Sequence, residues 1–129
     1  MPTFHPHRPT SARRVLVTGS RAWIDITTIR LALRPYAAAG VVLVHGDARG
    51  VDRAAVAIWR SWCLPTEAHP ADWATHGRAA GPIRNRLMVA LGADVCLAFI
   101  RDHSPGATGC AALAETAGIP THRREETSR

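Results

Sequence analysis

The sequence has 129 residues, of which 47% are hydrophobic and 20% charged, a composition that fits one soluble globular domain and excludes a disordered or fibrous chain. The net charge is +6 at pH 7, and no apolar run approaches the roughly 20 residues that span a bilayer, so we expect no membrane partner. The three cysteines are odd in number and far apart, which argues against a disulfide framework and indicates a reducing, cytoplasmic setting.

All 16 basic residues are arginine, and the excess persists inside the chain, where residues 13–120 hold 12 arginines and 8 acidic residues. Two explanations are open. A GC-rich genome favours arginine codons over lysine codons, and the forked guanidinium group is also the side chain best shaped to bind phosphate. An anionic partner, from a nucleotide to a nucleic acid, follows from the second explanation, but charge does not choose between these partners.

The chain divides into an expected flexible N-terminal arm at residues 1–12, one domain at 13–122 and a flexible polar tail at 123–129. Apolar runs without alternation at 15–18, 41–45 and 93–99 predict strands that are covered on both faces. Weaker strand candidates at 65–69 and 119–122 contain proline, which is typical of positions near a sheet edge.

Helical periodicity fills the gaps between these strands. The first helix is predicted to begin after Asp25 as its N-cap, the second to run from 51 to 62, and the fourth from 107 to 117, where Gly118 and Pro120 end it. The third helix is predicted from an apolar stripe formed by Ile83, Leu87 and Leu91. Strand and helix thus alternate along the whole domain.

Alternating strands and helices with right-handed crossovers produce a parallel sheet with helices on both faces. We therefore predict an α/β fold, a Rossmann-like three-layer sandwich whose mainly parallel five-stranded sheet has the order 3-2-1-4-5. In such a sheet a ligand binds outside the carboxyl ends of the strands, at the switch point between the first and fourth strands.

Three glycine-rich turns follow predicted strands at this edge: residues 19–21, residues 46–50 and residues 104–109. Glycine permits close backbone approach, and the free amides at a helix start favour an anion. The turn at 104–109 has the composition of a phosphate cradle, and two of the three turns carry arginine. The turns therefore predict a bound phosphate-bearing small molecule, with plain chain reversal as the alternative.

Two further segments add candidate ligand contacts. Arg84 and Asn85 lie in the first turns of the third helix, where the helix dipole disfavours a cation, so the arginine there suggests a use; surface ion pairing is the alternative. Asp72 and Trp73 follow the third strand, and Trp73 is a candidate for stacking on a base or ribose, with core packing as the alternative. The seven histidines are scattered, so we expect neither a metal site nor a cofactor.

The predicted ligand-binding residues are Gly19, Ser20, Arg21, Gly46, Asp47, Arg49, Asp72, Trp73, Arg84, Asn85, Gly106, Thr108 and Gly109.

Five segments taken together resemble the YspA/YpsA-related branch of the SLOG superfamily: 17–21, 44–52, 69–73, 80–85 and 93–99. The resemblance covers residues 13–122. It implies a Rossmann-like domain that binds nucleotides or nucleotide-derived ligands, and a more distant similarity to the LOG phosphoribohydrolases and to the DNA-processing protein DprA. Because relatives dimerise through helices, it also implies a homodimer.

Comparison with the LOG pattern PGGxGTxxE leaves open whether this protein is an enzyme. In the stretch from Pro105 to Leu113, Gly106 and Gly109 match the pattern, but Leu113 stands where the catalytic glutamate belongs. Glu115 is two residues late, about 200° away around a helix, and cannot simply replace it. A nucleotide N-glycosidase would therefore need another carboxylate near the ribose.

The carboxylate candidates for that role are Asp47, Asp52 and Asp72, with Arg84 stabilising phosphate or leaving-group charge. Three hypotheses remain at this point. The domain binds a nucleotide and hydrolyses its N-glycosidic bond, it senses a nucleotide without chemistry, or, less favoured, it binds nucleic acid as DprA does.

Overall fold

The computed structural model describes residues 13–128, and the predicted N-terminal arm at 1–12 lies outside the described residues. Five strands form one sheet in the order β3-β2-β1-β4-β5: β1 (Arg14–Gly19), β2 (Val42–His45), β3 (Thr66–Ala68), β4 (Val95–Arg101) and β5 (Thr121–Glu126). Every neighbouring pair is parallel, which confirms the predicted fold class and strand order.

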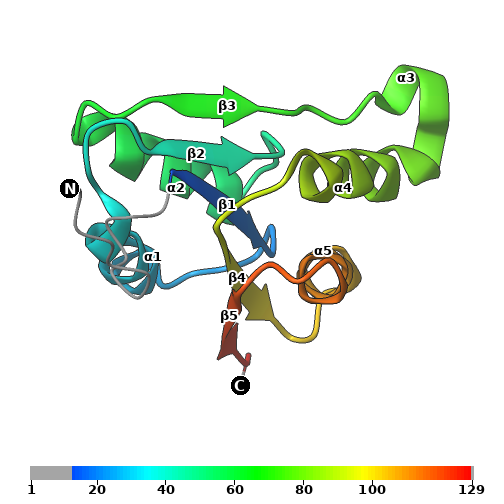
Figure 1. Ribbon diagram of the computed structural model, residues 1–129. Coiled ribbons are helices and arrows are strands. Elements are labelled where there is room, and N and C mark those ends of the chain that lie inside the picture. The colour runs from blue at the N-terminus through cyan, green and yellow to red at the C-terminus, as the bar shows by residue number, and fades with distance from the viewer. Residues whose placement is uncertain (1–12, 129) are drawn as a thin grey trace.

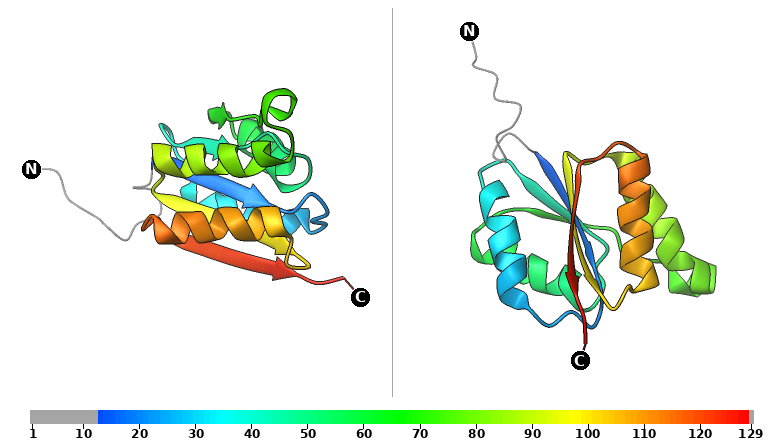
Figure 2. Two further views of the ribbon diagram at one scale, coloured as in Figure 1. Left: turned by 90° about the vertical axis from the view of Figure 1, so that its right-hand side faces the viewer. Right: turned by 90° about the horizontal axis from the view of Figure 1, so that it is seen from below.

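Helices cover both faces of this sheet (Figure 1, Figure 2). On one face lie α1 (Ile26–Leu33) and α2 (Val51–Ser61), and on the other lie α4 (Ala80–Leu91) and α5 (Pro105–Thr116). The short α3 (Trp73–His76) projects beyond the end of β3. The remaining helical elements are two 3-10 helices, η2 (Arg34–Tyr36) and η3 (Gly77–Ala79). Among residues 13–128, no helix is long and apolar enough to cross a membrane.

The central strands alternate between two cores, which explains their unbroken apolar runs. Val15 and Val17 of β1 pack with Trp59 against α1 and α2, whereas Leu16 packs with Met88 on the α4–α5 face. A strand that is covered on both faces gains from an apolar residue at every position, so it shows no period of two. The first helix begins as predicted, because the Asp25 carboxylate accepts the Thr28 amide at 3.2 Å.

Two sequence predictions differ from the structure. The tail expected at 123–129 is ordered as far as Glu126, because β5 pairs with β4 from Cys96↔Thr121 to Arg101↔Glu126. The Glu126 carboxylate pairs with Arg101 and accepts the amides of Ile24 and Asp25, each at 3.0 Å. An edge strand fixed by charged groups resembles a polar tail in sequence.

The second difference concerns the buried face of α4. Leu87 and Leu91 of the predicted stripe are each 51% exposed, whereas Met88 and Val89 are buried against the sheet and α5. The inner face of α4 begins with Ala80 and Gly81, which contribute little hydrophobicity to a sequence pattern but allow close packing. The periodicity of the large side chains therefore pointed to the wrong side of the helix.

Candidate functional site

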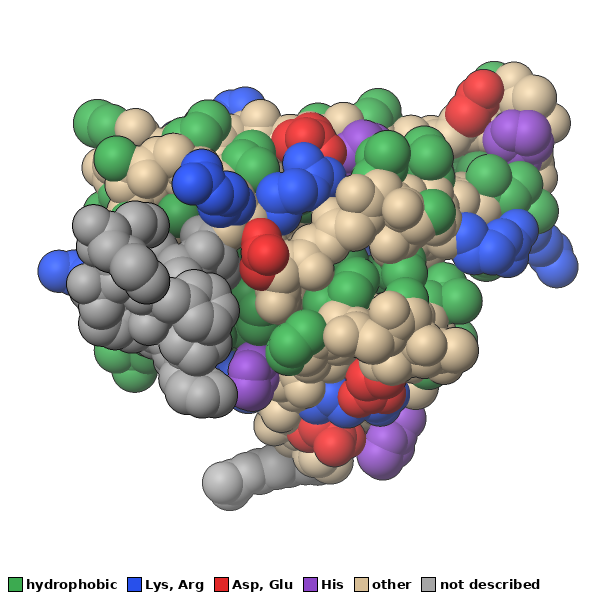
Figure 3. All heavy atoms as spheres, in the orientation of Figure 1, with side chains coloured by type: hydrophobic (Ala, Val, Ile, Leu, Met, Phe, Trp, Pro, Cys, Tyr) green, Lys and Arg blue, Asp and Glu red, His purple; other side chains and the backbone are tan. Residues whose placement is uncertain are grey.

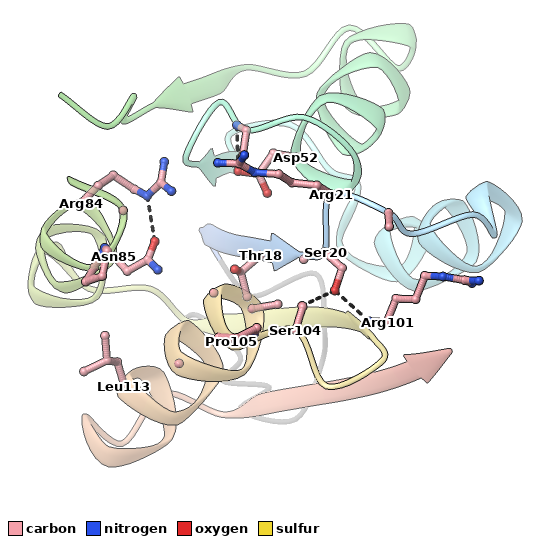
Figure 4. Close-up of a pocket in the computed structure, with 18 of the residues that line it drawn as sticks. Thr18, Ser20, Arg21, Asp52, Arg84, Asn85, Arg101, Ser104, Pro105 and Leu113 are labelled. Carbon is pink, nitrogen blue, oxygen red and sulfur yellow. Dashed lines mark hydrogen bonds between the residues drawn. The ribbon is translucent and has the colours of Figure 1, made fainter. Parts of the chain in front are cut away.

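A cavity of about 760 Å³ opens at the carboxyl ends of β1 and β4, between the N-terminal ends of α4 and α5 (Figure 4). This is the switch point of the sheet, where chain connections leave in opposite directions and a crevice results. The cavity is lined by Thr18, Gly19, Ser20, Arg21, Ala22, Ala48, Asp52, Trp73, Gly81, Pro82, Arg84, Asn85, Met88, Arg101, Asp102, Ser104, Pro105, Gly106, Ala107, Gly109 and Leu113.

The turn after β1 holds two other segments in place. A Cβ atom on Gly19 would lie 2.6 Å from Val51 Cγ1, so only glycine lets β1 end this close to α2. The buried Ser20 hydroxyl accepts the Arg101 amide at 2.7 Å and is hydrogen-bonded to the Ser104 hydroxyl. Ser20 therefore fastens the β4–α5 connection, and its hydroxyl group is already engaged within the protein.

The N-terminus of α5 faces the cavity. Ser104 precedes the helix without capping it, because its hydroxyl bonds to Ser20 instead, and Pro105 has no N–H group. Thr108 is the first residue whose amide reaches a carbonyl one turn back, that of Ser104 at 3.0 Å. The amides of Gly106 and Ala107 thus lack intrahelical acceptors, and together with the helix dipole they favour an anion in the cavity.

Arg84 of α4 brings a positive charge to the opposite wall. Its guanidinium group donates to the Gly46 carbonyl, its Nη1 lies 3.4 Å from the His69 carbonyl oxygen, and its Nε donates to Asn85 Oδ1 at 2.8 Å. No carboxylate forms an ion pair with Arg84 within residues 13–128. The side chain is held rigidly by neutral oxygens while its charge remains uncompensated by direct contact.

Glycine at position 46 is what admits this guanidinium group. A Cβ atom there would lie 2.6 Å from Arg84 Cζ, far inside van der Waals contact. The sequence predicted Gly46 as a ligand contact, but the structure places it beneath Arg84, outside the cavity lining. Its role is to let the arginine approach the backbone.

Asp52 lies in the first turn of α2 with only 5% of its surface exposed. Its Oδ2 accepts the Gly46 amide at 2.9 Å and the Ala48 amide at 3.3 Å, which fixes the glycine-rich turn after β2. Burial raises the pKa of this carboxyl group to about 6, although the two amides and the charge of Arg84 pull in the opposite direction.

Trp73 and Arg21 form the rim of the cavity. The Trp73 ring is 49% exposed, and the Arg21 guanidinium carbon lies 5.8 Å from its centroid in a cation–π contact. A Cβ atom on Gly81 would be 3.4 Å from the ring edge, so α4 passes directly beside the tryptophan. The alternative interpretation of Trp73 as a core residue is therefore wrong, and the ring is exposed at the mouth of the cavity.

Two comparisons with known proteins bear on the family of this chain. Residues 13–76 match the model of the YspA, cpYpsA-related SLOG family. Gene 61 protein of Mycobacterium phage D29 is 47% identical over 119 residues, covering 84% of this chain and 93% of that protein. The chain belongs to the YspA, cpYpsA-related SLOG family. This confirms the resemblance found in the sequence motifs.

A solved structure shares the fold of this SLOG domain. DNA processing protein A from Helicobacter pylori, which was described in a single-stranded DNA binding mode, superposes with a TM-score of 0.63. The sequences are 20% identical, and the match covers 91% of this chain and 67% of that one. At this identity the likeness concerns the fold alone.

The SLOG domain brings eight of the predicted ligand residues together around one cavity with Asp52, which was predicted as a catalytic carboxylate; the eight are Gly19, Ser20, Arg21, Trp73, Arg84, Asn85, Gly106 and Gly109. Five others lie outside the lining. Gly46 is covered by Arg84, Asp47 and Arg49 are exposed, and Thr108 of α5 is not among the lining residues. Asp72 is the N-cap of α3 and accepts the Thr75 amide at 3.1 Å.

Sequence reasoning missed several lining residues, chief among them Arg101 and Met88. Arg101 ends β4 at the same sheet edge as the glycine turns, a position that could have revealed it, but its charge is paired with Glu126. Met88 looks like an ordinary core residue in the sequence, although it stands four residues after Arg84 as a methionine does in a similar LOG stretch. Ser104 and Pro105 belong to the predicted phosphate turn and both line the cavity; the Ser104 hydroxyl, predicted as a phosphate donor, is hydrogen-bonded to Ser20.

The position at which the LOG resemblance predicts a catalytic glutamate is apolar in this SLOG domain. Leu113 lines the cavity there, and Glu115 instead forms an ion pair with Arg123 at 2.7 Å, on the side of α5 that faces β5. Asp52 is the one predicted carboxylate that reaches the cavity. Within residues 13–128, no group of three or more His, Cys, Asp or Glu side chains could hold a metal ion.

Proposed function

We propose that this SLOG domain binds a nucleotide or nucleotide-derived ligand, with the phosphate between the N-terminus of α5 and Arg84. The observation that carries the proposal is that two independent sources of positive potential open into one cavity. One is the pair of amides at Gly106 and Ala107, and the other is a guanidinium group without an ionic partner. Both suit a phosphate group better than a neutral ligand.

The rim of the cavity supports a base. The half-exposed Trp73 ring offers an aromatic face at the rim, and base–aromatic stacking contributes about 1–3 kcal/mol per base. Arg21 already lies against this ring and would stay close to both the base and the phosphate. A volume of about 760 Å³ is within the usual range for small-molecule sites.

Calorimetry with AMP, NAD and ribose 5-phosphate tests the proposal. Wild-type protein is expected to bind at least one of these phosphates, and Arg84→Gln is expected to weaken that binding at least about tenfold, since a charge-assisted hydrogen bond contributes about 1.5–3 kcal/mol. Arg30→Gln is the matched control, because Arg30 is an exposed arginine on α1, away from the cavity. No heat with any phosphate at millimolar concentration would overturn the proposal.

Whether the bound nucleotide is cleaved is a separate question with its own test. Asp52 supports an N-glycosidase, because it places a carboxyl group in the cavity. Leu113 supports a sensor without chemistry, because the position of the usual glutamate is apolar. Chromatography of AMP or NAD after incubation with the protein distinguishes the two, since only cleavage releases free base.

A nucleic-acid ligand is the second candidate, favoured by the fold shared with the DNA processing protein A structure. Figure 3 shows arginine and acidic side chains interspersed over one face of the molecule, without a continuous basic stripe. We favour the small ligand, because the α5 N-terminus and Arg84 both face one cavity. Binding of single-stranded DNA with a steep salt dependence would reverse this preference.

The homodimer also stays a proposal. Leu87 and Leu91 lie on the exposed side of α4, next to the partly buried Ile83, and would suit a helix-to-helix contact between two copies. Sedimentation of wild-type protein and of Leu87→Glu tests this, because a charge in such an interface would dissociate the dimer.

A further inference from the structure

Asp52 presents one free oxygen to the cavity. Its Oδ2 is fully used by the Gly46 and Ala48 amides, whereas no hydrogen bond to Oδ1 exists among the described residues. The residue is almost wholly buried in the protein and yet lines the cavity, where Figure 4 places it across from Ser20 and Thr18. Its second oxygen is therefore poised to meet a ligand rather than bulk water.

The charged and titratable groups around Asp52 do not neutralise it by direct contact. Arg84 of α4 acts at a distance, since its guanidinium group is bonded to carbonyl oxygens, and Asp47 on the same turn is a like charge. Cys110 of α5 is a buried thiol whose pKa burial raises. The other charged groups that line the cavity are Arg21 at the rim, Arg101, which is paired with Glu126, and Asp102.

We propose that Asp52 binds the phosphate group of the ligand as a neutral acid, with Oδ1–H donating a hydrogen bond to a phosphate oxygen. This inference rests on the proposed function, and it assigns Asp52 a ligand-binding role that needs no bond cleavage. The proton comes from solvent as the ligand enters. Two anions in one poorly hydrated cavity repel strongly, and protonating one of them turns that repulsion into a hydrogen bond.

In the free protein the pKa of Asp52 is already raised toward the pH at which the ligand would bind. The pKa of Asp52 is about 6, mainly through burial, so at pH 7.5 the carboxyl group is still mostly ionised. A phosphate dianion nearby raises that pKa further. Binding is then accompanied by proton uptake, and the affinity decreases as pH rises from 6 to 8, by about tenfold if the bound-state pKa lies about one and a half units higher.

Asp52→Asn is a matched variant. The asparagine oxygen can accept both backbone amides, and the NH₂ group can donate to phosphate at every pH, so the variant mimics the protonated acid. AMP serves as the probe. Its own phosphate titrates near pH 6, but this contribution is the same for both proteins and cancels in their comparison.

The experiment is calorimetry of AMP binding at pH 7.5 in two buffers of different ionisation enthalpy, which counts protons taken up. On binding AMP, wild-type protein is expected to take up more protons than Asp52→Asn, by a large fraction of one proton. As pH rises from 6 to 8, the AMP affinity of wild-type protein should also decrease more than that of Asp52→Asn. Infrared difference spectra should show the carbonyl band of a carboxylic acid when AMP binds to wild-type protein.

Each other outcome overturns the inference. Equal proton counts in the two proteins would mean that Asp52 keeps its charge, and loss of AMP binding in a folded Asp52→Asn protein would mean that the carboxylate itself is required. Should the variant fail to fold, the wild-type proton count at pH 7.5, where AMP is almost wholly dianionic, decides alone. If wild-type protein binds AMP without proton uptake, this inference fails while the proposed function stands; if it binds no AMP, both fail for this ligand.

Discussion

Replacing Gly46 by alanine tests whether Arg84 is positioned by the backbone of the β2–α2 turn. The added Cβ atom would lie 2.6 Å from Arg84 Cζ and 2.9 Å from its Nε, whereas ordinary contacts are near 3.5–4.0 Å. The guanidinium group must therefore retreat by about 1 Å, which breaks its bond to the Gly46 carbonyl. Because Gly46 does not need a positive φ, the effect comes from this collision and not from backbone strain.

Loss of a hydrogen bond from a charged donor costs about 1.5–3 kcal/mol, so the free energy of unfolding should decrease by that amount. For a chain of this length the melting temperature should fall by about 6–11 °C. Thermal unfolding followed by circular dichroism measures the change, and AMP calorimetry should show weaker binding. Gly109→Ala is the control for stability: no atom lies within 4 Å of its added Cβ, and alanine in a helix interior should stabilise the protein by about 0.5–1 kcal/mol.

The reasoning is refuted if Gly46→Ala melts at the wild-type temperature and binds AMP with wild-type affinity. That result would mean that Arg84 does not rest on the Gly46 carbonyl in solution. A lower melting temperature with unchanged AMP affinity would mean that Arg84 does contact the Gly46 carbonyl but takes no part in AMP binding.

Three further substitutions have predictable effects on stability. Asp52→Asn should stabilise the protein by about 2 kcal/mol at pH 7.5 and by almost nothing near pH 4, because a folded-state pKa of about 6, raised from 3.8, favours the native state at low pH and that contribution is lost as pH rises through 6. Ser20→Ala should destabilise it by about 1–3 kcal/mol, since the buried Arg101 amide loses its acceptor. Glu67→Gln should cost at most about 1 kcal/mol at pH 7, because the Glu67–Arg14 pair is partly exposed, and the cost should disappear as pH falls from 4.5 through 2, where the lowered pKa of Glu67 lies.

Denaturant unfolding at pH 2, 4, 5.5 and 7.5 measures all three. A pH-independent effect of Asp52→Asn would contradict the raised pKa of the carboxyl group, and a Ser20→Ala protein as stable as wild type would contradict the role of the hydroxyl in fastening the β4–α5 connection. An effect of Glu67→Gln that persists at pH 2 would show that the glutamate stabilises the fold by something other than its charge.

The architecture was predictable from the sequence because its cause is local. Val15, Leu16 and Val17 are consecutive apolar residues, and only a strand between two helical layers buries all three. The limits of the sheet were harder to predict. The edge strand β5 is held by ion pairs such as Arg101–Glu126, and a polar segment fixed from a distant part of the chain carries no local sign of being a strand.

The location of the candidate site was predictable for a topological reason. The carboxyl ends of parallel strands meet at one edge, so the turns after β1 and β4 had to converge. The part played by each residue in those turns was not predictable. Asp72 was predicted as a ligand contact but is the N-cap of α3. Gly46 was also predicted as a ligand contact, but its role is to leave room for Arg84, which lies far from it in the sequence.

The central claim is that a phosphate group sits between the α5 N-terminus and Arg84. A crystal structure of the protein with AMP tests it most directly. We expect phosphate oxygens within hydrogen-bond distance of the Gly106 or Ala107 amide and of the Arg84 guanidinium group, with adenine against Trp73. AMP bound elsewhere on the protein, with this cavity filled only by water, would contradict the account.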